Sequence, residues 1–380
     1  MAAPPPPPAL MDELIEEFLL RLPPEDPARL VRAALVCKPW GRLVSCPRFR
    51  RRYREHHRTP PLLGFVQAAR GSNSTCLTHF VSTSSFRPPR AELSGWIAIH
   101  SCHGRVLCYP PPVKPPEKRL LVWNLVTGEQ RELPRLPWYP YLGASWNAAV
   151  LCAYSVGAGC SNLDCHHGPF VVVFVGTLRD KTVVGVYSSV TDAWGEPTFT
   201  QDRHKQFCLL TGSLVGNALY FNKMMGTKLL KYDLTTREIS AINLPAQAPK
   251  WQIVLMAMED GRLGFATMQE SKLCLWSRED GQDGDARWEQ SRIIELDALL
   301  PVQALSTEPR IVGCADGVED ILLGTRAGNF SVVLKSRRAK EIGLRGPGFG
   351  SFVVPVTSFC TPALETANSG EGSGAGASSA

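Results

Sequence analysis

The sequence lacks any segment of the kind that crosses a membrane or directs secretion. No apolar run in its 380 residues approaches the roughly 18 residues that span a bilayer, and the longest, Phe170 to Val175, has the length of a strand. The first residues, MAAPPPPPAL, carry neither an early positive charge nor an apolar core, which argues against a signal peptide. We therefore expect a cytoplasmic or nuclear protein with no membrane partner.

Short catalytic motifs are missing as well. The chain contains no G-x-S-x-G nucleophile elbow, no P-loop and no H-E-x-x-H motif. The glycines from Gly343 to Ser351 resemble a phosphate loop, but they precede an expected strand, whereas phosphate binding requires a helix N-terminus. We predict no catalytic residue, no cofactor and no enzymatic activity. The alternative is a ligand-binding or hydrolase site, for which only His100 and His103 lie in suitable positions.

The cysteines lack the spacing of a disulfide framework, although the chain has 12 of them. They are scattered, so we expect reduced and mostly buried thiols. The densest group, CSNLDCHH, contains Cys160, Asp164, Cys165, His166 and His167. Two cysteines and a histidine supply three of the four ligands of tetrahedral zinc, but neighbours such as Cys165 and His166 converge poorly on one ion. We predict a surface loop without a metal, and zinc is the alternative.

Short amphipathic helices are present between residues 10 and 56. Leu14, Phe18 and Leu22 recur every four residues and form the apolar face of a helix expected from about Asp12 to Leu22. Asp26 is a candidate N-cap for a second helix that begins at Pro27. This helix is expected to bury the apolar positions Leu30, Val31, Ala34 and Leu35.

A third helix is expected from Pro39, with an apolar stripe formed by Trp40, Leu43 and Val44. Three short helices enclose little core, because domains below about 40 to 60 residues are marginal alone. We therefore expect part of the apolar surface to be covered by a partner. The alternative is a helical hairpin that packs only on the rest of the chain.

This segment resembles the F-box family. The resemblance rests on LPP at 22–24, on Leu30 with Val31, and on VCK-x-W at 36–40 with a later Phe49. The chain departs from the family pattern with Leu10-Met11, where Leu-Pro is usual, and with Phe18, where Ile or Leu is commoner. The resemblance implies that the segment binds the Skp-family adaptor of a Skp-cullin-F-box ubiquitin ligase, and through it cullin. The expected Skp-binding residues are Leu10, Leu14, Ile15, Phe18, Leu19, Leu22, Pro23, Leu30, Val31, Leu35, Val36, Cys37, Trp40 and Leu43.

Positive charge gathers directly after these apolar positions. Seven arginines lie between Arg42 and Arg58, against the single acid Glu55, within a chain of formal net charge +6. Such a cluster can meet phosphate, but no interleaved aromatic residues or nucleic-acid motif accompany it. A solvated helix face beside an acidic partner explains it equally well, and we do not expect a nucleic-acid partner.

The chain from residue 60 to 364 reads as an all-β domain, with short apolar runs separated by Gly, Pro, Asn and Asp. An aromatic residue near a strand end, followed four positions later by Thr, occurs at Trp123, Tyr187 and Tyr232, and Trp276 is followed by Asp280. From Tyr187 the aromatic recurs after 45 and then 44 residues, which is the length of a four-stranded propeller blade. We predict a β-propeller of about six blades, closed by pairing of Leu62–Val66 with Phe352–Phe359. A β-sandwich is the alternative.

This region lacks the Trp-Asp and Gly-Gly signatures of two common propeller classes. It resembles instead the F-box-associated propeller of plant, particularly grass, F-box proteins, through HRTPPLLGF at 57–65, CHGRVLCY, VWNLVTGEQRELP and SFCTPAL at 358–364. The resemblance implies a substrate-recognition adaptor of a ubiquitin ligase; a Skp-bound scaffold without a role in ubiquitination is the alternative. Candidate target-binding loops are Gly71–Pro89, Trp138–Trp146, Gly157–Pro169 and Ser277–Trp288. We expect a disordered leader at 1–9, an F-box at 10–56, the propeller at 60–364 and a disordered tail at 366–380.

Overall fold

The structure is a computed structural model of the whole chain. It describes residues 12–70, 76–111, 119–137, 142–155, 160, 165–178, 181–200, 212–222, 227–248, 253–279, 287–315, 320–343 and 353–361. The expected leader, the expected tail and nearly all of the glycine-rich stretch from Gly343 to Ser351 lie outside these residues.

Four helices form the N-terminal part, where the sequence predicted three. They are α1 (Asp12–Leu20), α2 (Pro27–Ala34), α3 (Lys38–Ser45) and α4 (Pro47–His57). The additional helix arises because Pro47 begins a new helix directly after α3, and the Sγ of Cys46 caps it by accepting the N–H of Phe49 at 3.3 Å. The α1 helix ends two residues before the predicted end. Asp26 is at the N-cap position of α2 but makes no side-chain cap bond, because its carboxylate accepts hydrogen bonds from Ser85 and Arg29 instead.

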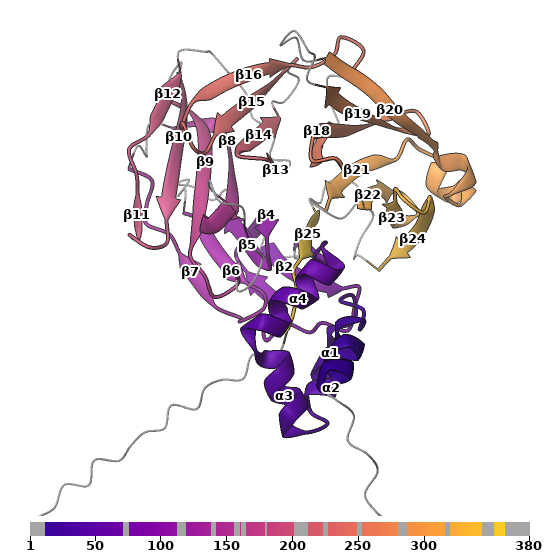
Figure 1. Cartoon of the computed structure of the whole chain (residues 1–380). Helices are drawn as coiled ribbons and strands as arrows, with labels where there is room; N and C mark the ends of the chain where they lie inside the picture. The colour runs from indigo at the N-terminus through magenta and orange to yellow at the C-terminus, as the bar shows by residue number, and fades with distance from the viewer. Residues whose placement is uncertain are drawn as a thin grey trace, which may run out of the picture.

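The rest of the described chain forms six antiparallel sheets of four or five strands, arranged as the blades of a ring (Figure 1). Blade 1 contains β25 (Val353–Thr357), β1 (Leu62–Arg70), β2 (Cys76–Ser82) and β3 (Glu92–Ser94). Blade 2 contains β4 (Ile97–Cys102), β5 (Arg105–Tyr109), β6 (Leu121–Asn124) and β7 (Gln130–Glu132). Blade 3 contains β8 (Leu142–Cys152), β9 (Phe170–Leu178), β10 (Lys181–Ser188) and β11 (Ala193–Trp194), with β12 (Thr198–Thr200) also paired to β10.

The remaining blades have four strands each. Blade 4 contains β13 (Ser213–Val215), β14 (Ala218–Asn222), β15 (Lys228–Asp233) and β16 (Ile239–Asn243). Blade 5 contains β17 (Val254–Ala257), β18 (Leu263–Gln269), β19 (Lys272–Glu279) and β20 (Arg287–Glu295). Blade 6 contains β21 (Arg310–Cys314), β22 (Asp320–Thr325), β23 (Gly328–Val333) and β24 (Arg338–Ile342). Short 3-10 turns lie at Ala153–Ser155, Leu296–Ala298 and Val302–Leu305.

The two ends of the β region close the ring, as the sequence predicted. The C-terminal β25 pairs antiparallel with β1, with Phe65 opposite Pro355 and Val66 opposite Val354. Blade 1 therefore contains strands from opposite ends of the chain. Closure of this kind leaves no open edge between first and last blades, and the prediction of about six blades is confirmed.

The aromatic repeat marks the same place in four consecutive blades. Trp123, Tyr187, Tyr232 and Trp276 all lie on the third strand of their blade, next to the hairpin that leads to the fourth. The residue after two of these aromatics accepts backbone N–H groups in a side-chain-stabilised turn: Asn124 from Val126 and Thr127, and Asp233 from Thr235 and Thr236. The repeat therefore encodes a hairpin start, with the aromatic ring buried.

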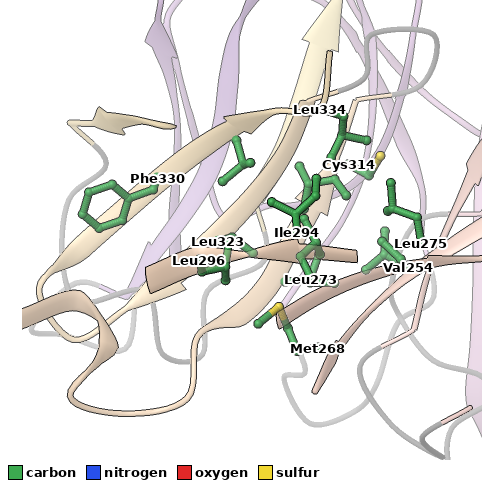
Figure 2. Close-up of a cluster of buried hydrophobic side chains, with 14 of the residues drawn as sticks. Val254, Met268, Leu273, Leu275, Ile294, Leu296, Cys314, Leu323, Phe330 and Leu334 are labelled. Carbon is green, nitrogen blue, oxygen red and sulfur yellow. The ribbon is translucent and has the colours of Figure 1, made fainter. Parts of the chain in front are cut away.

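Apolar side chains fill the spaces between neighbouring blades. Figure 2 shows one such cluster, which joins Val254, Leu273 and Leu275 of blade 5 with Leu323 and Phe330 of blade 6. Related clusters join the other blades, for instance blades 2 and 3 through Leu107, Val150 and Phe174. Because each blade is covered by two neighbours, both of its faces are buried, which explains the near-continuous apolar runs of the inner strands.

The helices are anchored to the propeller at blade 1. Phe359, just after β25, is buried in the core of the helices together with Leu19, Leu30 and Tyr53. The Tyr53 ring packs edge-on against Phe359 at 6.4 Å between centroids, and the Arg54 guanidinium lies 5.7 Å from the Phe359 ring centre. The propeller thus contributes a core residue to the helical part. No helix in the described part of the chain is long and apolar enough to cross a membrane.

Candidate functional site

Exposed apolar side chains concentrate on the first two helices and the residue pair that follows them. Of the ten large apolar residues exposed in the described chain, five lie here: Leu14, Phe18, Val31, Leu35 and Val36. Leu35 is 79% exposed and Phe18 is 58% exposed. Scattered single exposures are normal, whereas a concentration of exposed apolar side chains is typical of an interaction surface. We call these five residues the apolar docking face.

The structure divides the residues that the sequence assigned to Skp binding into three groups. Leu14, Phe18, Val31, Leu35, Val36 and Cys37 are exposed, while Ile15, Leu22, Pro23, Trp40 and Leu43 are partly exposed. Leu19 and Leu30 are 0% and 1% exposed in the helical core, so they offer no surface to a partner and we remove them from the proposed contacts. Leu10 lies outside the described residues. Val31 and Leu35, expected to be buried by their own helix, face outward.

Close packing beneath the docking face holds it in place. A Cβ added at Gly41 of α3 would lie 2.9 Å from the carbonyl oxygen of Ala34 in α2, so only glycine allows this helix contact. Leu19, Val44 and Phe49 fill the space between the helices. The face is therefore carried by a small but well-packed support.

Part of the arginine cluster has structural partners. Arg52 of α4 forms an ion pair of 2.7 Å with Glu16 of α1, and Arg54 is buried against Phe359. These contacts tie α4 to α1 and to the propeller. They favour a structural role for this part of the cluster over phosphate binding.

A pocket of about 300 Å³ lies between blades 2 and 3. Its walls come from β5 to β7, from the β8–β9 connection at 166–170, and from the turn after β10. Two of the polar groups that line it, Arg105 and Asn124, also hold the connection: Arg105 donates to the carbonyl oxygen of Gly168 at 2.5 Å, and Asn124 donates to that of His166 at 2.6 Å. The pocket includes residues of the predicted target-binding loop Gly157–Pro169.

Two arginines give the pocket a positive lining around an aromatic ring. The guanidinium groups of Arg105 and Arg131 lie 5.1 Å and 5.8 Å from the centre of the Phe170 ring. Arg131 also pairs with Asp192 at 3.0 Å, and the Tyr187 hydroxyl donates to the same carboxylate at 2.7 Å. These two hydrogen bonds hold the pKa of Asp192 below its usual value, while burial and the bond to Asp192 raise the pKa of Tyr187 to about 12. The hydrogen bond to Gly168 and the ion pair with Asp192 thus fix the two arginines in position beside the ring.

The histidines considered for a hydrolase site do not form one. His100 is buried, its Nε2 lies 3.2 Å from the carbonyl oxygen of Gly212, and burial lowers its pKa to about 4. His103, in the turn between β4 and β5, instead faces a group of cysteines. The two histidines therefore have different surroundings and do not face one shared site.

Three cysteines and His103 come together at the end of blades 2 and 3. The possible ligand atoms of His103, Cys152, Cys160 and Cys165 all lie within 4.8 Å of one another. The Sγ of Cys160 is 3.0 Å from the Sγ of Cys165 and 3.7 Å from the Nδ1 of His103. Hydrogen bonds from Cys160 and Cys165 lower the pKa of Cys152, whereas hydrogen bonds to Cys152 and Cys160, together with burial, raise the pKa of Cys165. The sequence indicated Cys160 and Cys165; it missed His103, 57 positions before Cys160, and Cys152, which reads as a strand residue.

The other members of the CSNLDCHH motif have different positions. His166 and His167 line the pocket described above, with ring centroids 4.5 Å apart, and neither belongs to the four-residue group. Asp164 lies outside the described residues. The motif thus contributes to two adjacent features, the thiol cluster and the pocket.

Solved structures resemble this fold only distantly. A prolyl endopeptidase matches 73% of the chain at 15% identity with a TM-score of 0.37, and the match spans 38% of that protein, well under two thirds of its length. The quinone-bound aldose sugar dehydrogenase of Streptomyces coelicolor matches at 13% identity and a TM-score of 0.40, covering 72% of this chain and 87% of that one. A functionally unknown protein of Desulfotomaculum acetoxidans matches at 10% identity and 0.41, covering 77% and 89%. No curated protein matches the chain.

Two family models match the sequence itself. Residues 10–52 match the F-box domain, which is the part that carries the apolar docking face. Residues 147–352, more than half of the chain, match the β-propeller of F-box proteins described as AT5G49610-like. The F-box match lies on the four helices, and the propeller match begins within β8 of blade 3 and ends just before β25. The chain therefore belongs to the family of AT5G49610-like F-box proteins with a β-propeller.

Proposed function

We propose that this protein is a substrate-recognition adaptor of a Skp-cullin-F-box ubiquitin ligase. The observation that carries the proposal is the apolar docking face on a domain that matches the F-box model. Burying a large apolar side chain in an interface is worth about 1.5 to 3 kcal/mol. Five such side chains, from Leu14 to Val36, supply ample gross energy for a stable complex with a Skp-family subunit, even after the costs of association.

The chain contributes proximity, and no catalytic residue. A target held on the propeller shares one assembly with the charged conjugating enzyme, which raises the effective concentration of its lysines there. The junction at Phe359, buried in the helical core, supports this role because it limits independent motion of the helices. Cytoplasmic or nuclear location and plant origin stay predictions.

The pocket between blades 2 and 3 is the part of the propeller that we assign to target binding. Arg105 and Arg131 outnumber the single acid Glu129 in its lining, and both guanidinium groups lie over the ring of Phe170. Guanidinium groups recognise carboxylates and phosphates by paired hydrogen bonds. We therefore expect an acidic segment of the target protein to bind here.

The docking proposal is tested by co-purification of the full chain with a Skp subunit. We expect the wild type to form a stoichiometric complex and Leu35→Asp to abolish it, because a carboxylate placed in an apolar interface remains unpaired and desolvated. Val302→Asp is the matched control: Val302 is 82% exposed but lies on the propeller, so this variant should bind normally. Equal binding by both variants, or no binding by the wild type, would contradict the proposal.

Recruitment of cullin separates an adaptor from a scaffold. If the Skp complex of the wild type also binds cullin, the ligase role is supported. A Skp complex that excludes cullin would instead support the scaffold alternative. Loss of target capture by Arg131→Glu with retained Skp binding would place the target at the pocket.

A further inference from the structure

We propose that His103, Cys152, Cys160 and Cys165 bind one structural zinc ion. Their four ligand atoms converge within 4.8 Å, and three sulfurs with one imidazole nitrogen form a standard donor set for closed tetrahedral zinc. Zn–S bonds of about 2.3 Å and Zn–N bonds of about 2.0 Å place neighbouring donors roughly 3.5 to 3.8 Å apart. The separation of 3.7 Å between Cys160 Sγ and His103 Nδ1 lies within that range, and that of 3.0 Å between Cys160 and Cys165 is shorter.

Separate segments of the chain supply the four donors, which lie in contact with one another. Side-chain hydrogen bonds link His103 to Cys152 and Cys160, and link Cys152 to both other cysteines of the group. The four donors come from the β4–β5 turn, the end of β8 and the β8–β9 connection. Cys152 and Cys165 are buried, and the other two are partly buried. Because separate segments supply the donors, one ion would join blade 2 to the connection.

The backbone at His103 is consistent with a positioned ligand. Its φ of 48° lies in the left-handed region, which costs free energy for a residue other than glycine. The next residue, Gly104, also has a positive φ, and its N–H donates to Thr357 of blade 1 at 3.1 Å. This turn therefore holds the imidazole in place against the three thiols.

The charge of the surroundings matches the proposed complex. Zinc with three thiolates and a neutral imidazole carries one net negative charge, so a nearby cation stabilises it. Arg105 is 4% exposed, and its guanidinium interacts electrostatically with Cys152 and Cys165. It also donates to Gly168 of the same connection at 2.5 Å. The positive charge that compensates the site is thus already placed beside it.

All four positions of the ion would be filled by protein, with none left for water or substrate. A closed site of this kind is structural, and binding releases the protons of the three thiols. Its effect would be to hold the segment that carries His166 and Gly168, which line the pocket. The zinc proposal does not depend on the ligase role, because it concerns only residues within the propeller.

Metal analysis of the full-length protein tests the proposal. We expect about one zinc ion per chain when the protein is purified without chelators and with a phosphine reductant. Cys160→Ser and Cys165→Ser should each lower the affinity for zinc by at least ~10-fold, so that each purified variant contains less zinc than the wild type. Cys37→Ser is the matched control, since Cys37 is an exposed thiol outside the cluster, and it should retain the zinc of the wild type.

A second measurement does not rely on variants that must fold. Replacement of zinc by Co²⁺ in the wild type should give the ligand-field absorption of tetrahedral cobalt with thiolate ligands. A wild type without stoichiometric zinc, with a Cys160–Cys165 disulfide found by mass spectrometry, would overturn the proposal. So would stoichiometric iron or copper in place of zinc, or zinc content that is unchanged in both ligand variants.

Discussion

The F-box helices and the propeller treat apolar side chains in opposite ways. The helices, which end at His57, expose five large apolar residues, as many as the whole described propeller, although the propeller is several times longer. The reason is geometric: each blade has a neighbour on both faces, whereas short helices pack on one side only. The propeller therefore buries most of its apolar side chains between its own blades, whereas the helices depend on contacts beyond their own core.

Substitution of Phe359, which joins the two regions, is expected to have the largest effect on stability. Phe359 leaves the propeller and is buried among Leu19, Leu30 and Tyr53, so Phe359→Ala should lower the free energy of unfolding of the helices by about 3 to 5 kcal/mol. Thermal denaturation followed by far-ultraviolet circular dichroism measures this loss. Phe199→Ala is the control, because Phe199 is 49% exposed, and it should change stability far less. A similar small effect for both variants would mean that the helices fold independently of the propeller.

Substitutions at two leucines of the F-box are expected to affect stability and Skp binding separately. Leu19→Ala should destabilise the protein by about 2 to 5 kcal/mol, because Leu19 is 0% exposed and its removal leaves a cavity. Leu35→Ala should leave stability within about 0.5 kcal/mol but weaken Skp binding by about 1.5 to 3 kcal/mol. Denaturant unfolding and calorimetric titration measure the two quantities. Comparable losses of stability in both variants would contradict the division into core and docking face.

The smallest expected effect concerns Asp320, a partly buried acid of the propeller. Burial raises the pKa of Asp320 above its usual value, and only a long contact of 3.5 Å with Ser331 opposes this. The folded state therefore holds the proton more tightly than the unfolded state, so stability falls as pH rises from the unfolded pKa through the folded one. Asp320→Asn should remove this fall, as measured by the midpoint of urea unfolding between about pH 4 and 7.

Asp260→Asn should change the pH dependence of stability in the opposite direction. Hydrogen bonds from Arg262 lower the pKa of Asp260, so its contribution to stability is present at neutral pH and is lost as pH falls through the lowered pKa. If the stability of Asp320→Asn depends on pH in the same way as that of the wild type, Asp320 is not desolvated in the folded state.

Strands with strong local patterns could be predicted, and outer strands could not. The apolar run from Phe170 to Val175, expected to be a strand, lies within β9, and the aromatic repeat indicated the third strand in four blades. The outer strands β7, β16, β20 and β24 escaped prediction because most of their side chains face solvent. In β20, for example, Ile294 is buried, whereas its neighbours Ile293 and Glu295 are exposed. An edge strand carries little apolar pattern because it covers little core.

The candidate sites could likewise be predicted only in part from the sequence. The apolar periodicity of α1 indicated that Leu14 to Leu22 form one face, but not where core ends and docking face begins within it. The thiol cluster joins His103 to Cys160 across 57 positions, and local spacing holds no signal for such a contact. Cys152 could not be predicted as a member of the cluster either, because its position at the end of β8 has the pattern of an ordinary buried strand residue.

Three of the four helices, the blade repeat and the closure of the ring could be predicted from the sequence, because they follow from local periodicity and from the match between the first and last apolar strands. The tertiary structure decided which apolar residues stay exposed, where Arg105 and Arg131 form a pocket, and which histidine meets the cysteines. The pocket and the thiol cluster depend on how blades 2 and 3 pack side by side. That packing is set by side-chain contacts between segments far apart in the chain, so no local pattern records it.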